Sequence, residues 1–346
     1  MPLDPGMSPT IEKVINLAVA NHASDVHFKA KQVPAIRING EIMRLNFPVL
    51  TEEEIVAFTN FMCPRHDERS PLEARDFSWV HNGARFRVNV FLDGNGLCIS
   101  MRYLYIPTTD FATLGIPEIL KKMAERKSGM ILITGPTGSG KTTTLTCLID
   151  YINNTYPMHI VTLEDPIEYV HESKRSIISQ REIGVTALSY EHAIVEALRE
   201  DPDIIFVGEM RDRDSIRGAL RAAETGHLVL STLHTKGAAN TVTRVVDIFT
   251  AEEQNQVRMQ LSMCLLGVVS QQLVPRADHC GRVLATEVMM GTIPVQNLIR
   301  QQKIHMINST LDLSSSEGMH TMKHSLQELL DIGLIGQKEY DAYQIV

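Results

Sequence analysis

A short stretch rich in glycine and threonine constrains the fold of this chain more than any other. Residues 135–143 read Gly-Pro-Thr-Gly-Ser-Gly-Lys-Thr-Thr and fit the pattern G-x-x-x-x-G-K-[ST]. The apolar run 130–134 before it suits a buried strand, and residues 144–149 after it can begin a helix. A strand, a glycine-rich turn and a helix in this order bind phosphate, because glycines let backbone N–H groups approach the oxygens and a helix N-terminus attracts negative charge.

Each position of this loop has an expected role in binding a nucleotide. Lys141 would reach the β- and γ-phosphates, and the Thr142 hydroxyl would ligate Mg²⁺. A glycine-rich turn with an accidental lysine is the weaker interpretation, because the complete motif lies between two suitable flanking segments. The residues expected to bind the nucleotide are Gly135, Pro136, Thr137, Gly138, Ser139, Gly140, Lys141, Thr142 and Thr143.

Length and charge narrow the classes of protein further. A chain of 346 residues suits two domains better than one, because single hydrophobic cores stop growing at about 250–300 residues. The net charge is −8, and Lys and Arg form no long cluster. Binding to the backbone of nucleic acid needs a positive surface. We therefore expect no direct nucleic-acid partner. A basic pore formed by several copies of the chain is not excluded by this argument.

The cysteines and the apolar segments indicate the cellular compartment in which the protein is expected. The five cysteines are scattered and include no C-x-x-C pair, which disfavours a zinc or redox site and favours reduced thiols in the cytosol. No basic segment followed by an apolar core marks a signal peptide, and the longest apolar window, 261–269, is too short to span a bilayer. We expect a cytoplasmic protein without a transmembrane segment, whose contact with a membrane is peripheral or made through a partner.

The first third of the chain, residues 1–106, is expected to form a small α+β domain with an antiparallel sheet. One helix begins at Ser8 and Pro9, and Thr51 with Glu54 forms a capping box for a second. Alternating apolar residues and turn sequences such as Asn39-Gly40 predict strands at 35–38, 41–45, 84–92 and 97–104.

After a linker at 107–115, strands and helices alternate. This pattern is typical of a parallel sheet covered by helices, so residues 116–346 are expected to form an α/β domain. The predicted strands are 130–134, 159–163, 203–208 and 227–233, and the helices between them are 141–153, 189–200 and 213–225. The remaining third is expected to be mostly helical, most clearly at 251–269 and 325–330.

Two acidic residues follow apolar strands of this second domain. Glu209 comes after the apolar run 204–207 and a glycine, and Glu164 comes after the run 161–163. The carboxyl ends of parallel strands meet at the ligand-binding edge of such a sheet. Both acids are therefore candidates for polarising the attacking water, with Glu209 the first choice and also a candidate ligand of Mg²⁺. A solvated acid at a strand end is the alternative for each.

His227 and His234 flank the apolar run 228–233. Seven residues of strand span roughly 23 Å, and an odd separation points side chains to opposite faces, so a shared metal ion is disfavoured. A neutral histidine beside the γ-phosphate could sense the state of the nucleotide. Periodicity alone favours two hydrogen-bonded structural histidines.

Four motifs in this order resemble the ATPases of type II secretion and type IV pili. They are the glycine-rich loop, Leu-Glu-Asp-Pro-Ile-Glu at 163–168, Val-Gly-Glu-Met-Arg-Asp at 207–212 and Thr-Gly-His-Leu-Val-Leu-Ser-Thr-Leu-His at 225–234. In that family they are the Walker A, Asp, Walker B and His boxes. The resemblance implies ATP and Mg²⁺ as cofactors, a PAS-like N-terminal domain, a RecA-like P-loop ATPase domain and a ring-shaped homo-hexamer.

The resemblance also assigns roles outside the loop. It implies that His227 and His234 couple loss of the γ-phosphate to movement, and that Arg87 and Arg102 reach the nucleotide across a domain or subunit junction. There they would offset charge on the transferring phosphoryl group. Without the resemblance, solvated arginines on a small sheet would be the expected interpretation. The catalytic candidates are Glu209, Glu164, Lys141, Arg87, Arg102, His227 and His234.

The implied function is a motor that drives pilus retraction and twitching motility. Its implied partners are a platform protein of the inner membrane and other pilus ATPases. The absence of the four-cysteine zinc motif of extension and secretion ATPases favours the retraction branch. One departure stands at 294–301, where Gln296 and Gln301 replace an arginine and a glutamate of the retraction signature. An accessory relative, a ring that translocates nucleic acid and a nucleotide-binding module without hydrolysis are the alternatives.

Overall fold

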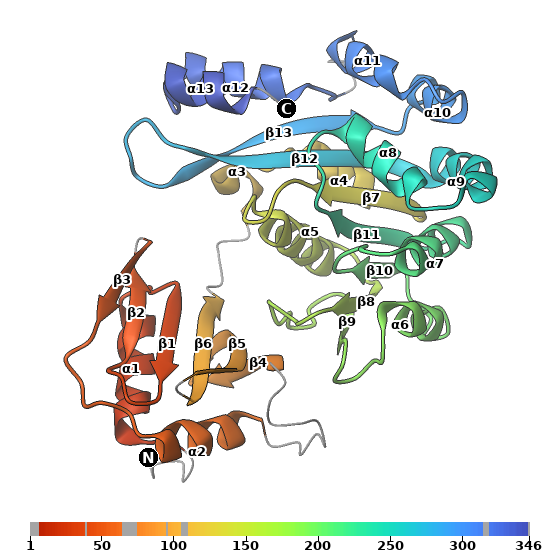
Figure 1. Cartoon of the computed structure of the whole chain (residues 1–346). Coiled ribbons are helices and arrows are strands. Elements are labelled where there is room, and N and C mark those ends of the chain that lie inside the picture. The colour runs from red at the N-terminus through yellow and green to blue at the C-terminus, as the bar shows by residue number, and fades with distance from the viewer. Residues whose placement is uncertain are drawn as a thin grey trace. The chain divides into compact units, whose positions relative to one another are not determined.

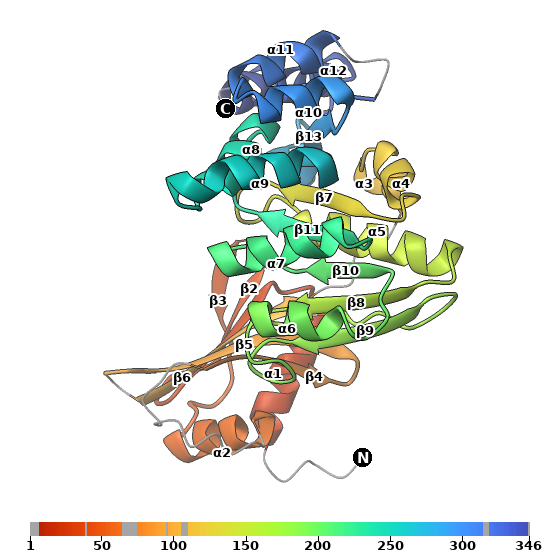
Figure 2. The same ribbon diagram turned by 90° about the vertical axis from the view of Figure 1, so that its right-hand side faces the viewer.

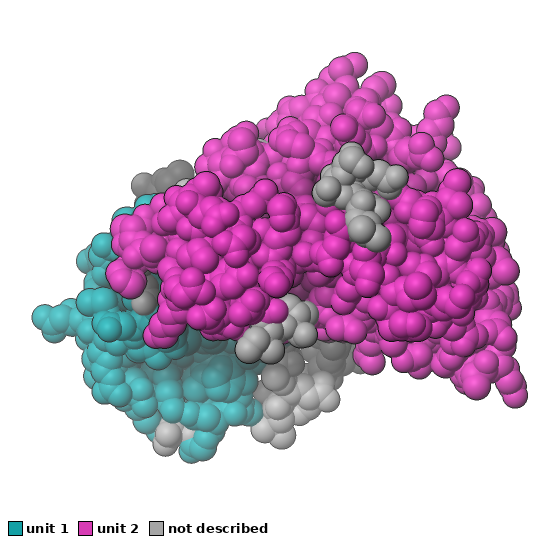
Figure 3. Space-filling view, turned by 90° about the horizontal axis from the view of Figure 1, so that it is seen from above, with its two compact units in different colours: residues 1–106 teal, residues 107–346 magenta. Residues whose placement is uncertain are grey.

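The computed structural model describes residues 7–38, 40–63, 75–94, 96–104, 110–313 and 318–344. The chain divides into two compact units, Met1–Ile106 and Pro107–Val346, which Figure 3 colours separately. The predicted turn residue Asn39 and the first part of the predicted linker, 107–109, lie outside the described residues. The rest of that linker includes the short helix α3 (Phe111–Leu114).

Within its described residues, the first unit is a six-stranded antiparallel sheet with two helices (Figure 1). Its helices begin where the sequence predicts, at the N-cap Ser8 and at the capping box of Thr51 and Glu54. They are α1 (Pro9–Ala20) and α2 (Glu52–Met62). In spatial order, the strands are β3 (Glu41–Arg44), β2 (Ala35–Ile38), β1 (Asp25–Lys29), β6 (Gly96–Leu104), β5 (Ala84–Asp93) and β4 (Arg75–His81).

The two faces of this sheet differ, because side chains alternate along each strand. Phe28 and Phe86 are buried in one core with Phe58 of α2 and with the apolar face of α1. Polar side chains of the same strands point the other way. Arg87 of β5 and Arg102 of β6 lie directly opposite each other in the register of these two strands.

The second unit, described over 110–313 and 318–344, contains a seven-stranded mixed sheet. Its neighbouring strands are parallel except for one antiparallel pair at an edge, β12 with β13. In spatial order, the strands are β13 (Arg282–Met290), β12 (Leu265–Pro275), β7 (Gly129–Thr134), β11 (Leu228–Leu233), β10 (Ile204–Val207), β8 (His159–Glu164) and β9 (Ile177–Glu182).

Helices cover both faces of this sheet (Figures 1 and 2). One face packs with α6 (Tyr190–Ala197), α7 (Arg213–Glu224), α8 (Ala238–Asp247) and α9 (Ala251–Cys264). The other packs with α3, α4 (Ile119–Ala124) and α5 (Lys141–Thr155). The chain ends in α10 (Ile293–Arg300), η1 (Ile304–Met306), α11 (Ile307–Leu313), α12 (Met322–Asp331) and α13 (Gln337–Tyr343). None of the helices in the described residues is long and apolar enough to cross a membrane.

The prediction of a helix over 251–269 is wrong in its last part. Helix α9 ends at Cys264, and β12 begins at Leu265 and pairs with β7. Helices still outweigh strands in the last third, but β12 and β13 extend the sheet beyond β7. The physical reason is that β12 is buried on both faces and begins with the largely apolar residues 265–269, which fit a buried helix as well as a strand. The edge strand β9 was not predicted either.

Candidate nucleotide-binding site

The glycine-rich loop joins the carboxyl end of β7 to the first residue of α5, which confirms the predicted strand, loop and helix. Gly135, Gly138 and Gly140 have φ angles of 144°, 76° and 89°, which residues with a side chain rarely adopt. A Cβ on Gly135 would also lie 2.3 Å from the carbonyl oxygen of Gln271. The loop therefore owes its tight path to glycine, and it ends at a helix N-terminus whose first N–H groups have no partner within the helix.

Lys141, the first residue of α5, is turned back onto this loop. Its Nζ donates hydrogen bonds to the carbonyl oxygens of Gly135 at 2.9 Å and Pro136 at 3.1 Å. Burial lowers the pKa of this ammonium group, and the charge of Glu209 opposes that change. Phosphate oxygens can replace these two carbonyl oxygens as hydrogen-bond acceptors of the ammonium group. Both kinds of oxygen accept, and phosphate also carries negative charge.

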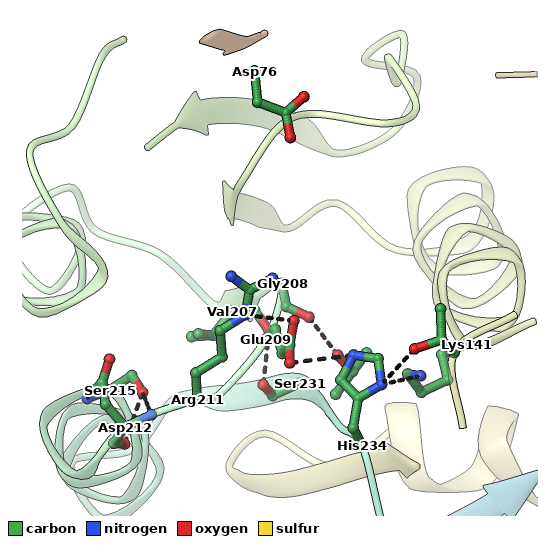
Figure 4. Close-up of polar contacts among 12 residues, drawn as sticks. Asp76, Lys141, Val207, Gly208, Glu209, Arg211, Asp212, Ser215, Ser231 and His234 are labelled. Atoms are coloured by element: carbon green, nitrogen blue, oxygen red, sulfur yellow. Dashed lines mark hydrogen bonds and ion pairs between the residues drawn. The ribbon is translucent and has the colours of Figure 1, made fainter. Parts of the chain in front are cut away.

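His234 connects this lysine to Glu209 (Figure 4). The Nδ1 atom of His234 lies 3.4 Å from Lys141 Nζ, and its Nε2 lies 3.2 Å from Glu209 Oε1. An ammonium group has only donors, so Nδ1 is the acceptor and the proton is on Nε2, facing the carboxylate. The Thr137 hydroxyl of the loop also lies 3.4 Å from Nδ1. Three segments far apart in sequence therefore meet through one imidazole ring.

The residues on either side of Glu209 bond to the two strands that flank β10. The Gly208 N–H donates to the Leu163 carbonyl of β8 at 2.8 Å, and the Met210 N–H donates to the Thr232 carbonyl of β11 at 3.1 Å. The second carboxylate oxygen, Oε2, accepts a hydrogen bond from Arg211 Nε at 2.8 Å, and this bond raises the pKa of the guanidinium group. Glu209 is thus fixed at the carboxyl edge of the sheet beside the loop.

Glu164 ends β8, the strand next to β10, and is buried. Its Oε1 accepts hydrogen bonds from the Thr162 hydroxyl at 2.7 Å and from Gln180 Nε2 at 3.1 Å. Burial raises the pKa of this carboxyl group to about 7, although both hydrogen bonds act in the opposite direction. A carboxyl group with such a pKa can give or take a proton near neutral pH.

Comparisons with known proteins agree with this geometry. Residues 4–330 match the family described as "Type II/IV secretion system protein". The chain belongs to this family. It is 48% identical over 306 residues to a "Twitching motility protein" of Neisseria gonorrhoeae, covering 87% of this chain and 82% of that protein. It is 44% identical to the "Type IV pilus retractation ATPase PilT" of Pseudomonas aeruginosa, covering 95% of this chain and 96% of that one.

A solved structure of a family member has the same fold. It is described as the pilus retraction motor PilT with bound ADP, and it superimposes with a TM-score of 0.87 at 43% identity. The match covers 96% of each chain. A relative of nearly the same length that binds ADP supports the assignment of the glycine-rich loop to a nucleotide.

The structure does not bring His227 to this site within its own unit. His227 precedes β11 and His234 follows it, so their seven-residue separation along the strand spans roughly 23 Å. The His227 Nδ1 lies 3.1 Å from the Ala222 carbonyl oxygen at the end of α7. Within this unit the interpretation as a hydrogen-bonded structural histidine fits its contacts, and the catalytic role of His227 stays a prediction.

Arg87 and Arg102 lie in the first unit, on the polar face of its sheet. Arg87 donates to Asp76, with Nη2 and Oδ2 2.5 Å apart, and Arg102 Nε donates to Asp25 Oδ1 at 3.1 Å. The Arg102 side chain is 67% exposed despite this contact. An exposed guanidinium group is able to contact an anion.

Sequence reasoning missed Arg211, Gln180 and Gln271. Arg211 lies inside the quoted motif 207–212, so its position two residues after Glu209 was a usable signal. Gln180 and Gln271 lie on β9 and β12, two strands that the sequence did not predict. Their partners, Glu164 and Ser139, are 16 and 132 positions away in the chain. No local pattern marks such contacts.

Proposed function

We propose that this chain is an ATP-hydrolysing motor that retracts a type IV pilus and works as a homo-hexamer. The observation that carries the proposal is the set of contacts from Lys141 through His234 to Glu209 at the carboxyl edge of the sheet. Two relatives named for pilus retraction and twitching motility, at 44% and 48% identity, support the type of work that hydrolysis drives.

The binding of ATP starts from the glycine-rich loop. Its N–H groups and the Lys141 ammonium group hold the phosphates, while the hydroxyl of Thr142 and the carboxylate of Glu209 would hold Mg²⁺. Both are oxygen donors, the kind that this ion prefers. When bound, Mg²⁺ offsets negative charge on the β- and γ-phosphates.

Glu209 is proposed to polarise the water that attacks the γ-phosphate. The His234 Nε2 proton and the Arg211 guanidinium group each contact one oxygen of its carboxylate, so they fix its orientation. Glu164 is the second acid, placed at the end of the neighbouring strand. With a pKa of about 7, it can take up or release a proton during turnover.

His234 is proposed to report loss of the γ-phosphate. One of its ring nitrogens lies beside Lys141 and Thr137, and the other lies beside Glu209. A change in the partners of Lys141 therefore changes the position of the ring that touches Glu209. This links the state of the nucleotide to the strand end that carries the acid.

We propose that the chain consists of two domains joined by a linker. Residues 1–106 would be a PAS-like domain, 107–115 a linker and 116–346 a RecA-like domain, with Arg87 and Arg102 completing a nucleotide site across a junction. The exposed guanidinium group of Arg102 supports such a role. We further propose a cytoplasmic location at the inner membrane through a pilus platform protein, with other pilus ATPases as partners.

Glu209→Gln tests the enzymatic part of the proposal. The amide keeps the size of the side chain and loses the carboxylate, so ATP should bind while hydrolysis falls by about 10³-fold or more. Glu224→Gln, at the exposed end of α7, is the matched control and should hydrolyse ATP like the unchanged protein. Normal turnover by Glu209→Gln would remove Glu209 from the catalytic role, and absence of hydrolysis by the unchanged protein would refute the motor.

A further inference from the structure

Gln271 of β12 packs against the glycine-rich loop and forms a hydrogen bond with it. Gln271 is completely buried, and its Nε2 donates a hydrogen bond of 2.8 Å to the Ser139 carbonyl oxygen. The backbone carbonyl oxygen of Gln271 would lie 2.3 Å from a Cβ on Gly135, and its side-chain Nε2 would lie 3.3 Å from a Cβ on Gly140. Gln271 therefore touches the loop at its beginning and at its end.

This hydrogen bond decides which way one peptide group of the loop faces. The carbonyl of Ser139 and the N–H of Gly140 belong to the same planar trans peptide, so they point in opposite directions. Because the carbonyl points toward Gln271, the Gly140 N–H points away from β12. An N–H directed out of the loop is the kind of group that binds phosphate oxygens.

Two buried polar atoms at this contact form no hydrogen bond within the part of the chain that the structure describes. Among the described residues, Gln271 Oε1 and Ser139 Oγ are buried side-chain atoms without a hydrogen-bond partner. The amide cannot turn over to relieve this, because Oε1 would then face the Ser139 carbonyl oxygen, another acceptor. Both atoms lie at the same contact between β12 and the loop.

The neighbouring residue of β12 holds a second loop of the site. Ser270 Oγ accepts a hydrogen bond of 2.9 Å from the Gly237 N–H, which is three residues past His234. Two consecutive residues of β12 thus hold the phosphate loop and the segment that follows His234.

We propose that Gln271 is a positioning residue for the glycine-rich loop, which holds the Ser139 peptide so that its N–H side faces the phosphates. The proposal rests on the proposed function only in requiring that the loop bind a nucleotide. It predicts that Gln271 affects nucleotide affinity more than the rate of the chemical step, since the acids Glu164 and Glu209 do not touch it.

Gln271→Met removes the donor while keeping a side chain of similar length. Affinity for a fluorescent ADP analogue should fall by about tenfold, because the Ser139 carbonyl loses its partner and the peptide is free to turn. KM for ATP should rise similarly, with kcat within about threefold of the unchanged protein. The matched control is Gln272→Met, which changes the adjacent buried glutamine of the same strand, on the other face of the sheet.

The outcomes separate the alternatives. If Gln271→Met and Gln272→Met bind the analogue equally well, the positioning role is refuted. If both lower the melting temperature and only Gln271→Met loses affinity, the role is specific. Gln271→Leu also removes the donor and places another apolar side chain there, and it should also bind weakly, so the test remains decisive if the methionine variant does not fold. No binding by the unchanged protein would instead refute the proposed function.

Discussion

The Nε2 atom of His234 lies 3.2 Å from Oε1 of Glu209, while the other nitrogen of the same ring faces the lysine of the glycine-rich loop. The two residues come from the carboxyl ends of neighbouring parallel strands, β11 and β10. This contact joins the group that binds phosphate to the group proposed to polarise water.

Replacing His234 by alanine should separate catalysis from binding. Glu209 loses the hydrogen bond that orients Oε1, so kcat for ATP hydrolysis should fall by about 100-fold. The loop and Lys141 remain, so nucleotide affinity measured by fluorescence should change by less than about threefold. His279→Ala, in the exposed turn between β12 and β13, is the control. Equal kcat values for the two variants would contradict a role for His234.

Glu164 should make the stability of the protein depend on pH. Its pKa is about 7 in the folded protein and near 4.5 when unfolded, so the folded state holds more protons between these values. Stability should therefore fall as pH rises through this window, with the full loss present above pH 7. Glu164→Gln cannot ionise, so denaturant melts should show it gaining stability over the unchanged protein from pH 5 to pH 8, by roughly 2–3 kcal/mol.

The opposite trend would contradict this account of Glu164. If the unchanged protein gained stability over the same range relative to Glu164→Gln, the carboxyl group would be favoured in its charged form. Its contacts with Thr162 and Gln180 would then outweigh its burial.

Two glycines of the phosphate loop should differ in their tolerance of a side chain. Gly135→Ala places a Cβ 2.3 Å from the Gln271 carbonyl oxygen, whereas Gly138→Ala meets nothing within 4 Å. Both have positive φ, so strain costs each about 1–2 kcal/mol, and the clash adds to this only at Gly135. Melting temperature and nucleotide affinity should fall clearly more for Gly135→Ala. Equal effects would show that the loop can move away from β12.

Arg102→Ala tests whether the loop is completed from another part of the assembly. An arginine that reaches the transferring phosphoryl group contributes about 10³–10⁵ in rate, so kcat should fall by about 10³-fold. Arg37→Ala is a matched control, because Arg37 Nε lies 3.6 Å from the same Asp25 that binds Arg102. Exposed ion pairs contribute little to stability, so both variants should fold. Unchanged hydrolysis by Arg102→Ala would mean that the loop works without this arginine.

The sequence predicts what is encoded locally. The glycine-rich loop, the capping box of Thr51 and Glu54 and the strand before Glu209 each depend on neighbouring residues, and the structure has all three. Strand β12 was missed because both its faces are buried, which removes the alternation that identifies a strand.

The missed contacts have a different cause. Gln271 meets Ser139 only because the sheet places β12 beside β7, a consequence of the tertiary fold. His227 was grouped with His234 because both lie in one motif, yet the strand between them carries them to opposite ends of the sheet. The separation of the two histidines by roughly 23 Å was itself predictable from the sequence, and the catalytic role of His227 stays a prediction.

The most direct test of the central claim is to image surface pili after deleting the gene in its host and restoring it as the unchanged sequence or as Glu209→Gln. If the chain is the retraction motor, deletion should leave excess pili that do not retract. The unchanged sequence should restore retraction, and Glu209→Gln should fail to do so. Normal pilus number and retraction after deletion would contradict the claim and favour the accessory role that Gln296 and Gln301 suggest.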